Sequence, residues 1–237
     1  MSKLLVKDKE VVVPGEVLAE GMDNLPGAGT YREGNDILAG RLGLTNIEGR
    51  TIKLIPLSGK YVPKRNDTII CKIIDINFSG WRVDTNSAYS AMLSIKDATS
   101  DYIQKGADLT QYYNLGEYIV ANVVNVTSQK LIDVTMRGPG LHKLKGGRII
   151  EVSPYKVPRI IGKQGSMVGM LKQSTNCRIV VGQNGLVWIE GEPDKELLVE
   201  KAIRKIEKES HMAGLTDSIQ KFLEKETGVK LGDNNGL

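Results

Sequence analysis

The chain has only two cysteines and two histidines, and this scarcity excludes several classes of protein. Cys71 and Cys177 are too far apart for the C-x-x-C spacing that holds zinc, and the histidines show no H-x-x-x-H spacing. Two cysteines also cannot build the disulfide framework of a small secreted domain. We therefore expect no metal site, no cofactor, and two reduced thiols.

Long apolar segments are also missing. The apolar run near the N-terminus is too short for a signal peptide, and no stretch approaches the roughly 18 apolar residues of a membrane span. We expect a cytoplasmic protein with no membrane partner. The sequence has only two phenylalanines but 26 glycines, which indicates many turns and thin cores. Several small β-rich modules fit this composition better than one large core.

Positive charge is concentrated in one part of the chain. The formal net charge is only +4, yet the segment 137–172 holds eight basic residues and a single acid, Glu151. Such a basic stripe is typical of a protein that follows a phosphate backbone, although a solvated basic face is the alternative. The eight residues are Arg137, Lys143, Lys145, Arg148, Lys156, Arg159, Lys163 and Lys172.

The first two thirds of the chain have the pattern of β structure. Residues 1–64 show short apolar runs broken by Pro-Gly and Ser-Gly pairs, which predicts a small N-terminal β-domain. Segments rich in Val, Ile and Thr then predict a five-stranded barrel of the OB type within 65–145. The five predicted strands are 68–76, 81–85, 89–93, 117–126 and 130–135.

The pattern changes near Gly146, where we place the start of a third domain, 146–213. The expected order is strand, helix, helix, strand, strand, helix, with Asn184-Gly185 as the hairpin turn and a left-handed backbone at Asn184. Residues 214–237 are expected to form a C-terminal helix followed by a flexible tail. The fold class is thus multidomain and mainly β, with an α+β domain near the C-terminus.

The most informative string runs from Val157 to Met167 and contains Gly162-Lys163-Gln164-Gly165 between two predicted helices. Without a Cβ, the two glycines let an RNA backbone lie against the main chain, and the following helix N-terminus can meet phosphate. The string resembles the KH domain family, whose G-x-x-G loop clamps about four nucleotides of RNA.

This resemblance implies RNA-binding roles for the loop and its neighbours. Lys163 and Gln164 lie in the loop, while Lys156 and Arg159 precede it and would add charge for phosphate. Bases would be read in an apolar groove beside Ile160, Ile161 and Ile179. Replacing Gly162 and Gly165 by Asp should then weaken binding of single strands without unfolding the protein.

The barrel resembles the RNA-binding domain named after ribosomal protein S-one, through its Val/Ile-rich first strand and the string Trp81-Arg82-Val83-Asp84. Such barrels stack bases on exposed aromatic rings and track phosphates with basic side chains. For Trp81 and Tyr89, packing in the core is the alternative. The candidate residues are Phe78, Trp81, Arg82, Tyr89, Lys96 and Lys105.

Further strings narrow the family. Residues 27–31, 57–63, 137–141 and 182–185, in an order of β-domain, S-one barrel and KH domain, resemble the RNA-binding cap subunits of the archaeal exosome. His142 departs from this pattern, which has glycine there. The resemblance implies a non-catalytic subunit whose N-terminal domain contacts a six-membered ring of RNase PH-like proteins. The ring would degrade or tail RNA, and the cap would guide single-stranded, for instance A-rich, RNA into its pore.

Other functions remain open at this stage. The S-one and KH modules also occur together in free translation and transcription factors. The resemblance to the cap subunits implies that the protein sits on the ring with two others of its kind or mixed with a second cap protein. A purely structural ring clamp, in which RNA binding is incidental, is a further alternative. The densest acidic cluster, Glu190, Glu192 and Asp194, flanks a strand end and a predicted helix start, where acids complement the helix dipole. The sequence therefore favours a binding protein over a metal-dependent nuclease.

Overall fold

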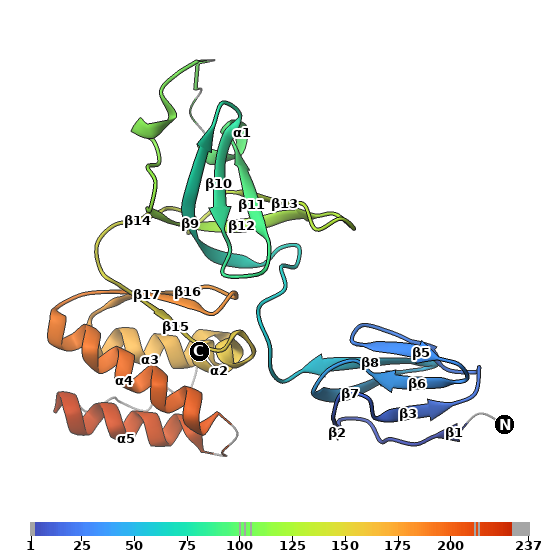
Figure 1. Cartoon of the computed structure of the whole chain (residues 1–237). Helices are drawn as coiled ribbons and strands as arrows, with labels where there is room; N and C mark the ends of the chain where they lie inside the picture. The colour runs from blue at the N-terminus through green and yellow to red at the C-terminus, as the bar shows by residue number, and fades with distance from the viewer. Residues whose placement is uncertain are drawn as a thin grey trace. The chain divides into compact units, whose positions relative to one another are not determined.

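A computed structural model describes residues 3–99, 101, 103–104, 106–210, 212 and 214–228 of the chain. The chain divides into two compact units, residues 1–59 and 60–237 (Figure 1). Among the described residues, the first unit has one buried hydrophobic cluster and the second has three, and each unit is described by itself. The predicted domain limits at residues 64, 145 and 213 remain predictions. The predicted flexible tail lies outside the described residues from 229 onward.

The N-terminal unit consists of two four-stranded sheets, with strand orders β1-β3-β6-β5 and β2-β7-β8-β4. Apolar side chains alternate along β8, so that Ile52 and Leu54 are buried while Ile55 is exposed. Inward side chains of both sheets, among them Leu18 and Ile37, form one core. The strands are β1 (Lys3–Leu4), β2 (Val11–Val12), β3 (Val17–Glu20), β4 (Leu25–Pro26), β5 (Thr30–Glu33), β6 (Asp36–Ala39), β7 (Gly43–Glu48) and β8 (Thr51–Pro56).

The second unit begins with a closed barrel, which confirms the predicted OB-type fold. The strand order is β13-β11-β10-β9-β12-β14, and an additional pairing of β13 with β12 closes the sheet on itself. A connecting segment holds α1 (Ile95–Ala98) and a 3₁₀ helix, η1 (Leu109–Gln111). The strands are β9 (Thr68–Asn77), β10 (Gly80–Asp84), β11 (Ser90–Ser94), β12 (Tyr118–Val126), β13 (Ile132–Thr135) and β14 (Lys143–Leu144).

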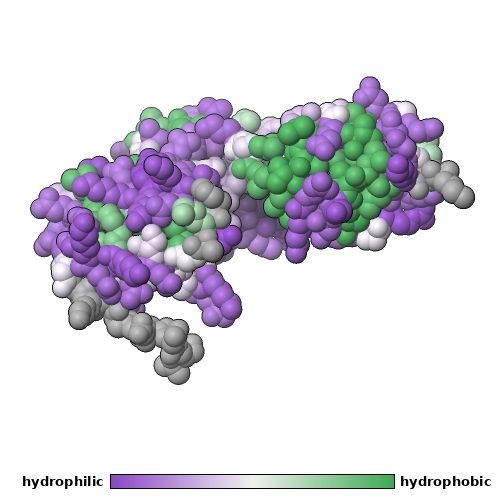
Figure 2. Space-filling view, turned by 90° about the horizontal axis from the view of Figure 1, so that it is seen from below, coloured by the Kyte–Doolittle hydropathy of each residue, from purple (hydrophilic) through white to green (hydrophobic). Residues whose placement is uncertain are grey.

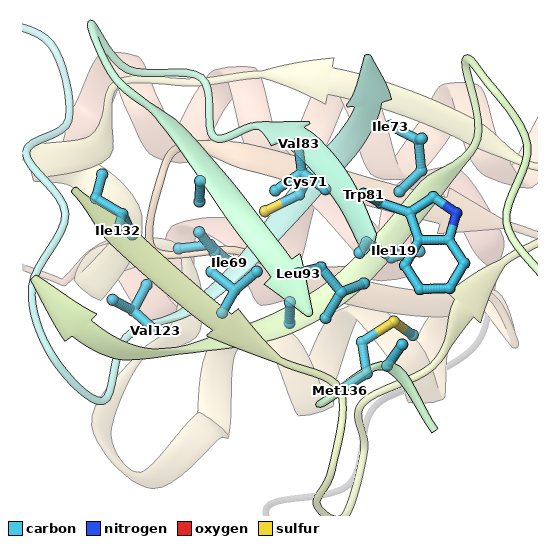
Figure 3. Close-up of a cluster of buried hydrophobic side chains, with 14 of the residues drawn as sticks. Ile69, Cys71, Ile73, Trp81, Val83, Leu93, Ile119, Val123, Ile132 and Met136 are labelled. Carbon is cyan, nitrogen blue, oxygen red and sulfur yellow. The ribbon is translucent and has the colours of Figure 1, made fainter. Parts of the chain in front are cut away.

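Apolar residues that alternate along these strands fill the barrel (Figure 3). Trp81 is the largest of the fully buried side chains, and its ring lies among Ile73, Leu93 and Ile119. The indole Nε1 donates a hydrogen bond to the carbonyl oxygen of Tyr113 at 2.9 Å. The tight turn from β9 to β10 places Gly80 so close to Leu93 that a Cβ would collide with its carbonyl oxygen.

The remaining residues form an α+β layer with the predicted order of elements. Its sheet has the order β15-β17-β16 and is antiparallel throughout. The helices pack on one face of the sheet, and α5 contributes Leu215, Ile219 and Leu223 to the same core. The elements are β15 (Arg148–Glu151), η2 (Pro154–Lys156), α2 (Val157–Ile161), η3 (Lys163–Gly165), α3 (Ser166–Thr175), β16 (Arg178–Val181), β17 (Leu186–Glu190), α4 (Pro193–Glu209) and α5 (Leu215–Thr227).

A small buried cluster joins the barrel to this layer. Ile70 and Val120 from the barrel pack against Trp188 from β17, with Leu144 of the connecting strand between them. The Trp188 Nε1 donates to the carbonyl oxygen of Gly146 at 2.8 Å, so the indole also fixes the connecting segment. The sheet therefore faces the helices on one side and the barrel on the other, as Figure 1 shows.

Candidate nucleic-acid interface

The G-x-x-G loop is built from left-handed backbone conformations between α2 and α3. Gly162 has φ 75°, Gln164 φ 53° and Gly165 φ 81°. At Gly162 a Cβ would lie 2.7 Å from the backbone nitrogen of Met167, so no other residue fits there without a shift. At Gly165 the nearest atom would be 4.0 Å away, but the positive φ still disfavours a side chain. Asp at Gly162 would therefore strain the loop, so a substitution of both glycines cannot separate RNA binding from stability.

The two residues between the glycines are presented to solvent. Lys163 and Gln164 are exposed, and their side chains make no hydrogen bond or ion pair with any residue that the structure describes. The ten-residue helix α3 begins directly after the loop, so its first amide groups lie next to this free cation. A helix N-terminus carries unsatisfied N–H groups and partial positive charge, which together suit a phosphate.

The two basic residues before the loop have different environments. Lys156 is half-buried, and its Nζ donates to the carbonyl oxygen of Glu207 near the end of α4 at 2.8 Å. Arg159 is exposed and has no partner among the described side chains. Lys156 thus helps to hold α4 in place, whereas Arg159 is available to a ligand.

Packing buries two of the three residues of the predicted base-reading groove. Ile160 and Ile179 are 0% and 3% exposed and belong to the core that the sheet shares with the helices. Their positions on the inner faces of α2 and β16 leave little surface for a base. Ile161, at the end of α2, is half-buried and is the one residue of this predicted trio that solvent reaches.

At one end of the barrel, an exposed aromatic ring lies near basic residues. Phe78, in the turn after β9, is 97% exposed. The neighbouring Ser79 accepts a hydrogen bond from the backbone of Ile95 at 3.2 Å, which brings the turn to the start of α1 and to exposed Lys96. Arg137 belongs to the same end, because its Nε donates to the carbonyl oxygen of Thr99 at 3.1 Å. Phe78 and Lys96 are thus exposed at this end of the barrel, and their RNA-binding role stays a prediction. Arg137 adds a cation that the barrel prediction had left out.

Other predicted barrel residues are placed differently. Trp81 is 0% exposed and hydrogen-bonded inside the barrel, so its prediction as a base-stacking residue is wrong. Tyr89 is 38% exposed, so its ring is accessible for the predicted base stacking. Arg82 is exposed on β10 and pairs with Asp75 at 3.0 Å, an exposed ion pair of little energetic weight that a phosphate could replace. Lys105 lies outside the described residues.

The basic stripe of residues 137–172 is partly neutralised. Lys143 pairs with Glu117 at 2.6 Å, and Arg148 pairs with Glu200 at 2.8 Å. Partial burial is the largest single effect on Glu117 and opposes its ionisation. The hydrogen bonds from Lys143 and the Asn114 N–H, together with the charges of Lys143 and Lys145, outweigh burial and hold the pKa of this carboxyl below its ordinary value. The charge available to a ligand therefore comes mainly from Arg137, Lys145, Arg159, Lys163 and Lys172.

The string Gly182-Gln183-Asn184-Gly185 forms the predicted hairpin turn but also holds the barrel. Asn184 is fully buried, and its Nδ2 donates to the carbonyl oxygens of Ile70 at 2.7 Å and Thr85 at 2.9 Å. The predicted left-handed conformation at Asn184 is wrong, since Gly185 has the positive φ of 84°. The asparagine is needed for its side chain, which satisfies buried backbone groups of another domain.

Two further observations concern the described part of the chain. Among its residues, no group of three or more His, Cys, Asp and Glu side chains is placed to hold a metal ion. None of its helices is sufficiently long and apolar to span a membrane.

Comparison with known families agrees with this geometry. Residues 147–195 match the model of the KH domain, and residues 9–58 match the model of the exosome RNA binding protein RRP4 N-terminal domain. The two matches define a class of proteins that joins an exosome-type β-domain to a KH domain. The barrel lies between the two matched regions.

Whole-chain relatives identify the family more closely. The exosome complex component Rrp4 of Methanothermobacter thermautotrophicus is 43% identical over 96% of this chain and 72% of that protein. The Rrp4 component of Pyrococcus abyssi is 44% identical over 94% of this chain and 85% of that protein. A crystal structure of a protein assigned as an exosome complex RNA-binding protein superimposes with a TM-score of 0.64, at 36% identity, over 71% of this chain and 97% of that one. The chain belongs to the archaeal Rrp4 family.

Proposed function

We propose that this protein is a non-catalytic, RNA-binding cap subunit of an archaeal exosome. It binds single-stranded RNA and guides the strand into the pore of an RNase PH-like ring, which carries out 3′-to-5′ degradation or tailing. The observation that carries this proposal is the exposed G-x-x-G loop with Lys163 at its tip, in a chain that belongs to the Rrp4 family.

The loop geometry explains why single strands are the ligand. Gly162 and Gly165 let a sugar-phosphate backbone approach the main chain closely, and the amides of α3 and the Lys163 ammonium meet its phosphates. These contacts position the strand without reading its sequence. Phe78 at the end of the barrel offers a face for base stacking, which every base can use. The protein therefore accepts unstructured RNA of varied sequence.

Contact with the ring is proposed for the outer face of the second sheet in the N-terminal unit. Val11 lies opposite Leu44, which lies opposite Ile55, so three apolar side chains form a row across β2, β7 and β8. Figure 2 shows a continuous hydrophobic area on this unit. Exposed apolar patches of this kind usually mark protein interfaces. The face, hereafter the apolar face, consists of Val11, Val13, Leu25, Leu44, Ile55 and Leu57.

The loop is tested by substituting its two exposed residues while keeping both glycines. Lys163→Asp with Gln164→Asp places negative charge where a phosphate would lie, and Asp tolerates the positive φ of Gln164 better than most residues. We expect affinity for single-stranded RNA to fall at least about tenfold, a change of about 1.4 kcal/mol. The control variant, Lys201→Asp with Thr216→Asp, makes the same charge change on exposed positions of α4 and α5. Equal affinity of both variants for RNA would refute the loop assignment.

The cap assignment is tested by purification from native cells. The tagged protein is isolated at low salt, treated with nuclease to remove RNA bridges, and its partners are identified by mass spectrometry. We expect RNase PH-like ring subunits in stoichiometric amounts. Ribosomal or polymerase subunits without ring proteins would instead support a free translation or transcription factor that uses the same barrel and KH modules.

A further inference from the structure

A pocket of about 380 Å³ lies beside the segment that connects the barrel to the KH domain. Its floor is formed by apolar side chains on the barrel-facing side of the KH sheet, including Val180 and Trp188. Its volume is in the range of small-molecule sites, which begins at about 300 Å³. The lining residues are His142, Lys143, Lys145, Lys172, Cys177, Arg178, Ile179, Val180, Trp188 and Glu190.

Positive charge surrounds this apolar floor. Lys145 and Lys172 are exposed and form no ion pair with any described residue. The Arg178 side chain is 81% exposed and reaches Glu190 at 3.3 Å, an ion pair too exposed to hold the guanidinium firmly. Lys143 is already bound to Glu117. Lys145 and Lys172 are thus free to bind an anion, and Arg178 can join them when it leaves Glu190, the one acid of the pocket lining and the one that would oppose an anion.

Gly165, just before α3, and Gly169 within it lie between the G-x-x-G loop and Lys172, which lines this pocket. Gly165, Gly169 and Lys172 share one face of the helix, because seven residues make nearly two turns. The helix rises about 1.5 Å per residue, so Lys172 lies roughly 10 Å from Gly165 along the axis. A Cβ at Gly169 would meet nothing within 4 Å. Internal packing does not require this glycine, although glycine is unfavourable inside a helix.

We propose that the pocket binds one nucleotide of the same RNA strand that the G-x-x-G loop holds. The strand leaves the loop along the Gly169 side of α3, its phosphate binds Lys145, Lys172 and Arg178, and its base covers the apolar floor. The open space at Gly169 keeps the helix surface clear for the strand. This subsite extends the RNA contact from the KH loop toward the barrel, and it rests on the RNA binding proposed above.

The test uses two RNA lengths and the full chain. An oligomer of about 4 nucleotides fills the loop alone, and one of about 16 nucleotides also reaches the pocket. Lys145→Gln with Lys172→Gln should weaken binding of the long oligomer about tenfold and leave the short one unchanged. The slope of log affinity against log salt should fall by about 0.7 for each phosphate that the variant no longer neutralises. The control, Lys201→Gln with Lys208→Gln, removes the same charge from exposed positions on α4.

A second variant separates binding from folding. Glu190→Gln removes the acid that repels the phosphate and frees Arg178, so it should strengthen binding of the long oligomer severalfold, a gain that a folding defect cannot produce. If neither the double lysine variant nor Glu190→Gln changes the affinity for the long oligomer, the subsite proposal is overturned. An acidic segment of another protein would then be the better candidate ligand for the pocket. If the wild-type chain binds neither oligomer, the proposed RNA-binding function itself fails.

Discussion

The side-chain amide of Asn184 hydrogen-bonds both backbone polar groups of Ile70. Its Nδ2 donates to the Ile70 carbonyl oxygen at 2.7 Å, and its Oδ1 accepts from the Ile70 N–H at 3.3 Å. A side chain of the KH domain thereby makes the two backbone hydrogen bonds with Ile70 of β9 that a neighbouring strand would otherwise make. The backbone carbonyl of Asn184 also accepts from the Asn86 Nδ2 at 3.2 Å, which adds another link to the barrel.

Replacing this asparagine should loosen the junction between barrel and KH domain. In Asn184→Ala, the Ile70 and Thr85 backbone groups stay buried without partners, and we expect the free energy of unfolding to fall by about 3 kcal/mol. Urea unfolding followed by tryptophan fluorescence measures this. Gln183→Ala is the matched control: Gln183 is exposed, and its side chain accepts only from Thr68 N–H, so its loss should cost less than about 1 kcal/mol. Equal losses of unfolding free energy in the two variants would show that the buried Asn184 amide stabilises the junction no more than the exposed Gln183 does.

The two large aromatic residues at the start of the barrel should respond oppositely. Phe78→Ala removes an exposed ring, so we expect single-strand affinity to fall by about 2 kcal/mol while stability changes by less than about 0.5 kcal/mol. Trp81→Phe removes a buried indole and its hydrogen bond to Tyr113, so stability should fall by about 2 kcal/mol with affinity intact. RNA titration and thermal unfolding of both variants decide this. A Trp81 variant that folds normally but loses RNA would reverse the assignment.

Attachment to the ring should depend on the apolar face. Ile55 is a 49% exposed member of this face, and Ile55→Glu would bury a charge on association. We expect its binding to reconstituted RNase PH-like rings to weaken at least about tenfold, which is about 1.4 kcal/mol. RNA affinity should be unchanged, since the loop lies in the other unit. Asn35→Glu, which places the same charge on an exposed turn of the same unit, should bind rings normally in analytical ultracentrifugation.

The ion pair of Lys60 with Glu151 should give a small pH dependence of stability. Hydrogen bonds from Lys60 and Asn86 hold the pKa of Glu151 below its ordinary value of 4.5. A carboxyl with a lowered folded-state pKa stabilises the protein above its ordinary pKa, and this stabilisation is lost as pH falls through the folded-state value. Glu151→Gln should therefore melt below the wild type at pH 7, and the difference should vanish in acid below the lowered pKa. A difference that persists in acid would mean that the pair is not its cause.

The strands and the KH order followed from the sequence because local signals decide them. β9 and β12 are rich in Val and Ile, and the Gly162–Gly165 spacing lies between two segments of helical pattern. The burial of Trp81 could not be predicted from the sequence, since an aromatic residue on a strand fits either a core or a ligand-binding face. The role of Asn184 depends on contacts with Ile70, 114 residues away, which no local pattern reveals. The apolar face also needed the strand register, because only pairing shows that Val11, Leu44 and Ile55 are neighbours.

The buried cluster of Ile70, Val120, Leu144 and Trp188 joins the barrel and the KH domain into one packed unit. Because this cluster holds the two domains together, the fold sets the distance between Phe78 and the G-x-x-G loop. Under the RNA binding proposed above, a strand that contacts both Phe78 and the loop must exceed a minimum length, and a shorter fragment would bind at one site only and dissociate faster. Retention of RNA on the subunit would then depend on the length of the strand.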